Sequence, residues 1–129
     1  MSQLKSLILS LALLIPAGVS SASFKILIFT GSDWCPNCRR LEKKILVDTA
    51  FINYTKNRLL IQFADFPQHK KLDHATTEKN KALAEKYQFK GIYPSIFILD
   101  QEGNKKGQII YLNQSPKEFI DELKVLLEK

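Results

Sequence analysis

The most informative part of the sequence is residues 24–38, which read FKILIFTGSDWCPNC. Its first seven residues are mostly apolar and rich in branched and aromatic side chains, as is typical of a buried β-strand. Residues 31–33 predict a loop, and Pro36 predicts the first turn of a helix, where its missing N–H costs no hydrogen bond. This part of the chain therefore predicts a strand, a short loop and a helix that carries Cys35 and Cys38.

Cys35 and Cys38 are the only cysteines in the 129 residues, which excludes a scaffold of several disulfides. Separated by two residues, they can close a disulfide. A thiol at a helix N-terminus has its thiolate stabilised by the helix dipole, and its pKa falls from about 8.5 to roughly 3.5–7.5. Cys35 is thus the candidate nucleophile, and Cys38, one turn inside the helix, is the candidate resolving cysteine.

Other uses of the cysteine pair remain open. A structural disulfide across so short a loop contributes only about 2 kcal/mol on the chain-entropy model, against about 4.7 kcal/mol for a 100-residue loop. A metal site could combine Cys35 and Cys38 with His69 and His74, although the gap of about 30 residues between the two pairs exceeds the usual 12–15. Both histidines can equally be exposed loop residues.

The first 22 residues have the layout of a secretory signal peptide. Lys5 supplies a positive charge, residues 7–15 are a short apolar run that Pro16 ends, and residues 20–22 are small, as at a cleavage site. Spanning a bilayer needs about 20 apolar residues. We therefore expect a cleaved signal peptide and a periplasmic protein, with a membrane anchor formed by an uncleaved signal as the alternative. Residues 23–129 are the expected mature domain.

Composition and charge describe an ordinary folded chain. Hydrophobic residues make up 45% and charged residues 25%, which argues against disorder, and the length suits one domain. The net charge is +6, but the lysines are spread along the chain between acidic residues, without a block of five or six like charges. We expect a solvated surface and no nucleic-acid partner.

The remaining chain alternates apolar runs with turn signals, which predicts an α/β protein in which helices cover a central sheet. Ser115 and Glu118 form a capping-box pattern with Pro116 at the first helical position. Residues 69–75 are polar and predict a loop. The predicted elements are strands at 24–30, 59–64, 93–100 and 108–112, and helices from 35 to about 45, from 76 or 77 to about 89, and from 116.

The run Trp34-Cys35-Pro36-Asn37-Cys38, with Tyr93-Pro94 at the start of a later strand, resembles the thioredoxin-like family. The resemblance is closest to its exported bacterial members and covers about residues 24–127. It implies a thioredoxin-like fold with a central mixed four-stranded sheet flanked by helices. It also implies a thiol–disulfide oxidoreductase, with disulfide reduction as the expected direction and no cofactor.

The same resemblance assigns roles to individual residues. Cys35 would be the exposed attacking cysteine of a redox-active disulfide, and Cys38 the buried resolving one. Pro94 would form a cis peptide bond with Tyr93 beside the disulfide and bind the backbone of the substrate. Trp34 would shield the cysteine pair. The implied partners are exported proteins that contain disulfides, together with a membrane or soluble thiol redox partner.

The sequence also departs from the family pattern. Thioredoxins carry a buried acid six positions before the first cysteine, where this chain has Phe29. Asp33 and Glu42 match acidic positions of some exported members and are candidates for proton transfer to the cysteines, although Glu42 can equally be a solvated helix residue. The alternative function is a non-enzymatic thioredoxin-like module with a structural disulfide or a Cys/His metal site.

Overall fold

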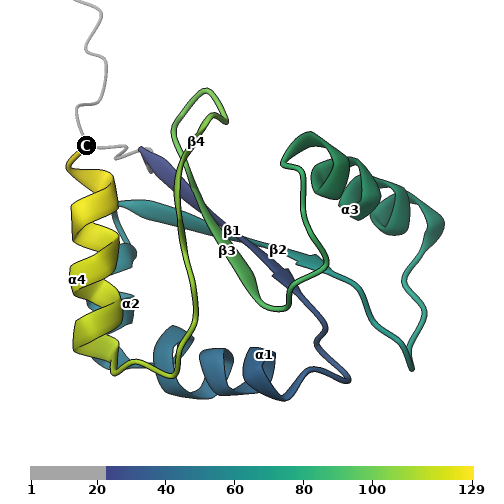
Figure 1. Ribbon diagram of the computed structural model, residues 1–129, viewed down its shortest axis with the longest axis horizontal. Coiled ribbons are helices and arrows are strands. Elements are labelled where there is room, and N and C mark those ends of the chain that lie inside the picture. Colours follow the sequence, from purple (N-terminus) through teal and green to yellow (C-terminus); the bar gives the residue numbers. More distant parts are fainter. Residues whose placement is uncertain (1–22) are drawn as a thin grey trace, which may run out of the picture.

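A four-stranded sheet lies at the centre of the computed structural model, which describes residues 23–129 (Figure 1). The predicted signal peptide lies outside the described residues. The elements in chain order are β1 (Phe24–Thr30), α1 (Pro36–Leu41), the π-helical turn η1 (Glu42–Leu46), α2 (Thr49–Thr55), β2 (Leu59–Asp65), α3 (His74–Lys86), β3 (Ser95–Leu99), β4 (Lys105–Ile109) and α4 (Pro116–Leu127). None of the helices among residues 23–129 has the length and apolar character needed to cross a bilayer.

The sheet is mixed, with strand order β2-β1-β3-β4. β1 runs parallel to β2, and Thr30 at its end pairs with Asp65. β3 is antiparallel to β1 and to β4. The predicted mixed four-stranded sheet with flanking helices is therefore confirmed.

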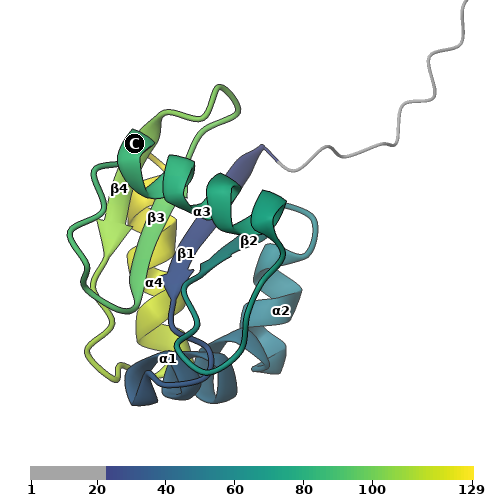
Figure 2. The same cartoon turned by 90° about the vertical axis from the view of Figure 1, so that its right-hand side faces the viewer.

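Both faces of the sheet are covered, which explains the uninterrupted apolar run in β1. Ile26 and Ile28 pack on the face that meets α1, α2 and α4. Leu27 and Phe29 point to the opposite face, which packs against side chains of α3 and the residues that follow it. Figure 2 shows α3 in front of the sheet and α2 and α4 behind it.

The start of α1 is fixed at the end of β1 by two local features. Pro36 occupies the first helical turn, as predicted, and the backbone N–H of Cys35 donates to the carbonyl of Gly31 over 2.9 Å. The capping box of α4 is also confirmed, with reciprocal bonds between Ser115 and Glu118.

The single helix predicted from residue 35 to about 45 is wrong in its second half. The α-helix ends at Leu41 and continues as η1, where the N–H of Val47 donates to the carbonyl of Glu42. A further helix, α2, was not predicted. Asp48 caps it by accepting from the N–H of Phe51 over 3.1 Å, and burial of Phe51 holds it against the core.

Two other predicted boundaries are wrong. α3 begins at His74, inside the predicted loop, because Asp73 accepts from the N–H of Thr76 and caps the helix there. The fourth strand covers residues 105–109 rather than 108–112. It is an edge strand whose only fully buried residue is Ile109, so its sequence lacks a strong apolar signal.

Candidate functional site

The two cysteines lie at the junction between β1 and α1 and are joined by a disulfide, as their spacing permits. Cys35 is the N-cap of α1, and its sulfur accepts from the backbone N–H of Cys38 over 3.2 Å. The Cα atoms of the pair are 5.3 Å apart. Because an N-cap sulfur faces the free N–H groups of the first turn, negative charge that develops on Cys35 is stabilised there.

The resemblance implied an exposed Cys35, and this is wrong for the disulfide form described here. Cys35 is only 4% exposed and Cys38 only 1%. The loop before Cys35 turns tightly, so that the N–H of Cys35 bonds back to Gly31. A shallow depression nevertheless reaches Cys35 and not Cys38; its lining consists of Trp34, Cys35, Pro36, Asn37, Arg40, Gly91 and Tyr93. Access therefore still distinguishes the two sulfurs.

The loop before β3 forms the other wall of this depression. The peptide bond between Tyr93 and Pro94 is cis, which confirms the predicted geometry. The ring of Tyr93 meets Trp34 edge to face, with 4.9 Å between ring centroids. Desolvation, and secondarily the negative charge of Asp65, raise the pKa of Tyr93, so its hydroxyl is neutral at physiological pH.

Trp34 is fixed from two sides. Its indole N–H donates to the backbone carbonyl of Phe66 over 2.8 Å. Its ring lies directly over Gly31, where a Cβ atom would overlap the indole. The loop before Cys35 thus needs glycine at position 31 so that the tryptophan can lie flat against the backbone.

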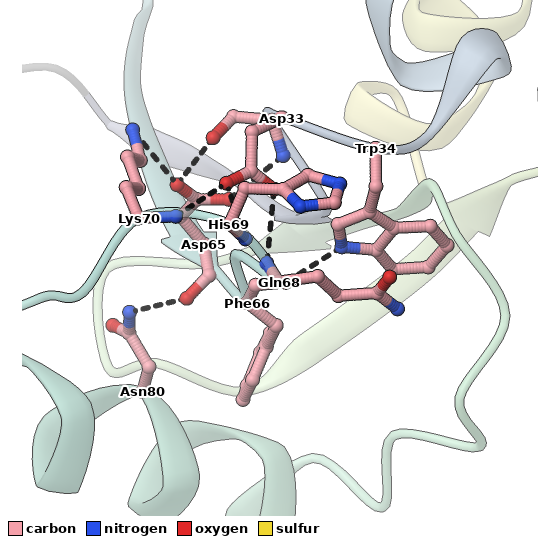
Figure 3. Close-up of polar contacts among 9 residues, drawn as sticks. Asp33, Trp34, Asp65, Phe66, Gln68, His69, Lys70 and Asn80 are labelled. Carbon is pink, nitrogen blue, oxygen red and sulfur yellow. Dashed lines mark hydrogen bonds and ion pairs between the residues drawn. The ribbon is translucent and has the colours of Figure 1, made fainter.

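Asp33 binds the loop that follows β2 rather than the cysteines (Figure 3). Its carboxylate accepts backbone N–H bonds from Gln68, His69 and Lys70, each of 2.9 Å. Desolvation alone would raise the pKa of Asp33, but these three bonds outweigh it and lower the pKa to about 2. At neutral pH the group is a fixed anion that orders residues 68–70.

Asp65, the last residue of β2, makes the reciprocal contact to the loop before Cys35, and sequence reasoning missed it. Its two oxygens accept from the backbone N–H of Ser32 at 2.9 Å and from the Ser32 hydroxyl at 2.6 Å. Lys70 lies 3.5 Å from the same carboxylate. The buried amide of Asn80 donates to the Asp65 carbonyl over 2.9 Å, which links this site to α3 (Figure 3). The loop before Cys35 is thus joined to the end of β2 and the loop after it by one carboxylate from each side.

Phe29 occupies the place of the buried family acid, and the structure surrounds it with aromatic rings. It is fully buried and stacks on Phe89 with 4.4 Å between centroids. Phe97 meets it edge to face at 5.4 Å, and Phe66 stacks at 6.4 Å. The ring centroids of Tyr93 and Phe89 are 5.1 Å apart, so the aromatic cluster extends to the wall of the depression.

The other predicted residues are dispersed. Glu42 is half-buried where α1 meets η1, one turn after Cys38. His69 belongs to the loop held by Asp33, and His74 begins α3. Within residues 23–129, no group of three or more His, Cys, Asp or Glu side chains is arranged to hold a metal ion. The structure therefore does not bring the two histidines together with the cysteines.

Comparisons with known proteins agree with this geometry. A family model described as a thioredoxin-like domain matches residues 17–126. The disulfide bond reductase DsbH of Chlamydia pneumoniae is 28% identical over 102 residues, which are 79% of this chain and 61% of that protein. The chain thus spans about three fifths of the length of this curated relative.

Solved structures show the same fold. A structure of a DsbH oxidoreductase superposes with a TM-score of 0.77 at 26% identity, over 83% of this chain and 74% of that one. The C-terminal domain of Neisseria meningitidis DsbD in the reduced form has a TM-score of 0.55 at 17% identity, and the match covers 80% of each chain. At that identity the second likeness concerns the fold alone.

Proposed function

Because the chain belongs to the thioredoxin-like family, we propose that it is a thiol–disulfide oxidoreductase that works through the Cys35–Cys38 pair. The observation that carries this proposal is the position of the pair. A disulfide begins a helix, and only one of its two cysteines lines a surface depression. This arrangement activates one thiol and shields the other, as two-step exchange requires.

The exchange begins from the reduced pair. The Cys35 thiolate attacks one sulfur of a substrate disulfide, and the other substrate sulfur leaves as a thiolate that takes up a proton. Cys38 then loses its proton and attacks the Cys35 sulfur of the mixed disulfide. The second substrate sulfur leaves, and the protein retains the Cys35–Cys38 disulfide. Two electrons have passed to the substrate, so a dithiol donor must reduce the pair before the next cycle.

We infer that disulfide reduction is the physiological direction. The support is the likeness to a relative whose name describes a disulfide bond reductase. Equilibration with a glutathione buffer tests this inference through the reduction potential. A value near −270 mV, typical of reducing thioredoxins, is expected, whereas a value near −120 mV, as in strong oxidants of this fold, would contradict it.

The proposed location is the periplasm, after removal of residues 1–22, and the proposed domain is residues 23–129. The short apolar run at residues 7–15 supports export. The substrates would then be exported proteins that contain disulfides, and a membrane or soluble thiol protein would supply electrons. Fractionation of cells that produce the full chain, with mass measurement of the mature protein, tests both points.

Around the pair we propose a substrate-binding surface of Trp34, Tyr93 and Pro94. Trp34 and Tyr93 line the depression beside Cys35, and Pro94 follows directly. For Asp33 we propose a positioning role, which its three amide bonds and its low pKa support better than proton transfer. Glu42, one turn after Cys38, remains the proposed proton-transfer group.

Trapping gives the sharpest test of the mechanism. A Cys38→Ala variant with an intact Cys35 should accumulate mixed disulfides with its substrates, because the resolving step is blocked. The matched control is Cys35→Ala, which keeps Cys38 but should capture nothing and lose reduction of insulin. If Cys35→Ala reduces insulin as fast as the wild type, or if the wild type has no activity, the chain is a non-enzymatic module instead.

A further inference from the structure

Four cations gather on the solvent side of α1 and η1, and together we call them the basic face: Arg39, Arg40, Lys43 and Lys44. All four side chains are exposed, while the opposite side of this segment is buried in the core. Residues four apart are neighbours on a helix surface. Lys43 and Lys44 of η1 therefore follow Arg39 and Arg40 of α1 by about one turn on the solvent side, although the charges look interrupted in the sequence.

The charge of the basic face is not neutralised by carboxylates. Arg40 donates to the side-chain oxygen of Asn37 over 2.6 Å, and Lys44 donates to that of Asn113 over 2.9 Å. These amide oxygens are neutral, so they orient the cations without cancelling their charge. The three ion pairs between side chains of residues 23–129 all lie elsewhere, in the loop after β2, in α3 and in α4.

Helix stability does not account for this arrangement. Cations near the carboxyl end of a helix are weakly stabilised by its dipole. Like charges one turn apart weakly destabilise a helix, and here the second pair of cations stands on the π-helical turn η1. The two effects are small and opposed, so the fold does not require four cations on this side of the segment.

The basic face is continuous with the depression at Cys35. Arg40 and Asn37 line that depression together with Cys35 itself. Gly91 and Tyr93 form its far wall, and Ile92, between them in the sequence, is 66% exposed next to it. A polypeptide that brings a disulfide to Cys35 would therefore meet cations on one side and an apolar side chain on the other.

We propose that the basic face docks an acidic segment of the protein whose disulfide is exchanged at Cys35. This inference rests on the proposed function and adds the class of its substrate or redox partner. Cations bordering a reaction site raise the local concentration of anionic partners and their association rate by roughly 10–1000-fold at low salt. The expected partner carries Asp or Glu close to its reactive disulfide.

The test compares two short synthetic peptides that contain the same disulfide, one flanked by Glu and one by Lys. The neutral compound bis(2-hydroxyethyl) disulfide reports the chemistry of the pair without a docking segment. The test variant is Arg39→Glu/Lys43→Glu, because both side chains are exposed and neither takes part in the hydrogen bonds described above. The matched control is Lys56→Glu/Lys79→Glu, which changes net charge equally at two other exposed positions, the C-cap of α2 and the middle of α3.

The wild type and the control should prefer the Glu-flanked peptide by about tenfold in kcat/KM at low salt, and high salt should abolish the preference. The test variant should lose or invert this preference. Each kcat/KM is divided by the value of the same protein with bis(2-hydroxyethyl) disulfide, which removes any change in the chemistry of the pair. Equal loss in both variants would overturn the docking face, because net charge alone would then explain the effect. If the wild type binds anionic vesicles and shows no preference between the peptides, the proposed docking of an acidic segment would also be overturned. The basic face would then be a membrane-binding surface.

Failure of the proposed function has a different signature, namely no exchange with any of the three disulfides. Docking is then measured as binding of the same two peptides with serine in place of cysteine. Tighter binding of the Glu-flanked peptide by the wild type and the control, but not by the test variant, supports the basic face. Equal binding of both peptides to all three proteins overturns it.

Discussion

The indole N–H of Trp34 donates a 2.8 Å hydrogen bond to the backbone carbonyl of Phe66. This bond joins the loop that precedes Cys35 to the loop that follows β2. Asp33 accepts three backbone N–H groups from the loop after β2, and Asp65, at the end of β2, accepts one from the loop that contains Asp33. The position of Trp34 beside the candidate redox pair therefore depends on residues more than thirty positions away.

Gly31→Ala should displace Trp34, because the new methyl group would overlap the indole ring. We expect a loss of about 1–3 kcal/mol in the free energy of unfolding, as is usual for overpacking. Trp34 is the single tryptophan, so its fluorescence emission should shift as well. Urea unfolding measures the stability. In a Trp34→Ala background the same substitution should cost much less, and an equal cost in both backgrounds would contradict the proposed overlap.

Asp33→Asn should destabilise the protein in a pH-dependent manner. The folded-state pKa of Asp33 is about 2, below the ordinary value of 3.8. A lowered pKa means that the ionised group contributes stability above about pH 4, and that this contribution is lost as the pH falls towards 2. The difference in urea midpoint between wild type and variant should therefore be largest near neutral pH and shrink on acidification.

The same variant separates positioning from proton transfer. If Asp33 only orders residues 68–70, the pH profile of disulfide exchange should keep its inflection points and change only in height. A displaced inflection in Asp33→Asn would favour the proton-transfer role instead. Glu42→Gln provides the comparison, because the proposed proton-transfer group should alter the shape of the profile.

Asp65→Ala should cost more than Ser32→Ala. Loss of the carboxylate leaves both the backbone N–H and the hydroxyl of Ser32 without their acceptor. Because this site is only part-buried, the cost should lie in the lower part of the range of about 1–3 kcal/mol that is typical of an unpaired buried donor. Ser32→Ala removes the hydroxyl bond and retains the backbone one, so about 0.5–1.5 kcal/mol is expected. Lys70→Ala should cost less than about 1 kcal/mol, since that side chain is 56% exposed. Urea unfolding of Asp65→Ala, Ser32→Ala and the variant that combines them measures the coupling. The combined variant should lose less stability than the two single losses added together, because the two side chains bind each other.

Local signals in the sequence were sufficient for the elements that place the cysteines. The apolar run of β1 and the proline at position 36 identify a strand and a helix start without any tertiary information. The capping box of α4 is equally local, because Ser115 and Glu118 satisfy each other within one turn. The family resemblance supplied the cis bond at Pro94, which no local pattern would have predicted.

Apart from the start of α3, which depends on its local cap at Asp73, the main features that the sequence did not predict depend on tertiary contacts. α2 is seven residues long, and it is held mainly by burial of Phe51 against α4 rather than by a helical pattern of its own. β4 contains Lys105 and Gly107, and its pairing with β3 determines its extent. The partners of Asp33 lie 35 to 37 residues away in the chain, a separation that no spacing rule connects.

Phe29 is the position at which this chain departs most from the family pattern, and its surroundings predict the consequence of restoring an acid there. Phe29 is fully buried and packed among aromatic rings. Phe29→Ala should cost about 3–5 kcal/mol through the cavity it leaves. Phe29→Asp should cost more at neutral pH, because a buried carboxylate without a cationic partner is strongly destabilising.

The pH dependence of Phe29→Asp distinguishes a buried charge from a cavity. Desolvation raises the folded-state pKa of a buried carboxyl above its unfolded value near 4. The folded variant therefore keeps its full stability below about pH 4, where the carboxyl is protonated in both states, and loses stability as the pH rises. The stability gap between Phe29→Asp and Phe29→Ala should thus be smallest in acid and widen towards neutral pH, the opposite sign to the effect of Asp33. Urea unfolding at several pH values measures it. A gap independent of pH would mean that the new carboxylate reaches solvent, and that the aromatic cluster around Phe29 opens more readily than its close stacking implies.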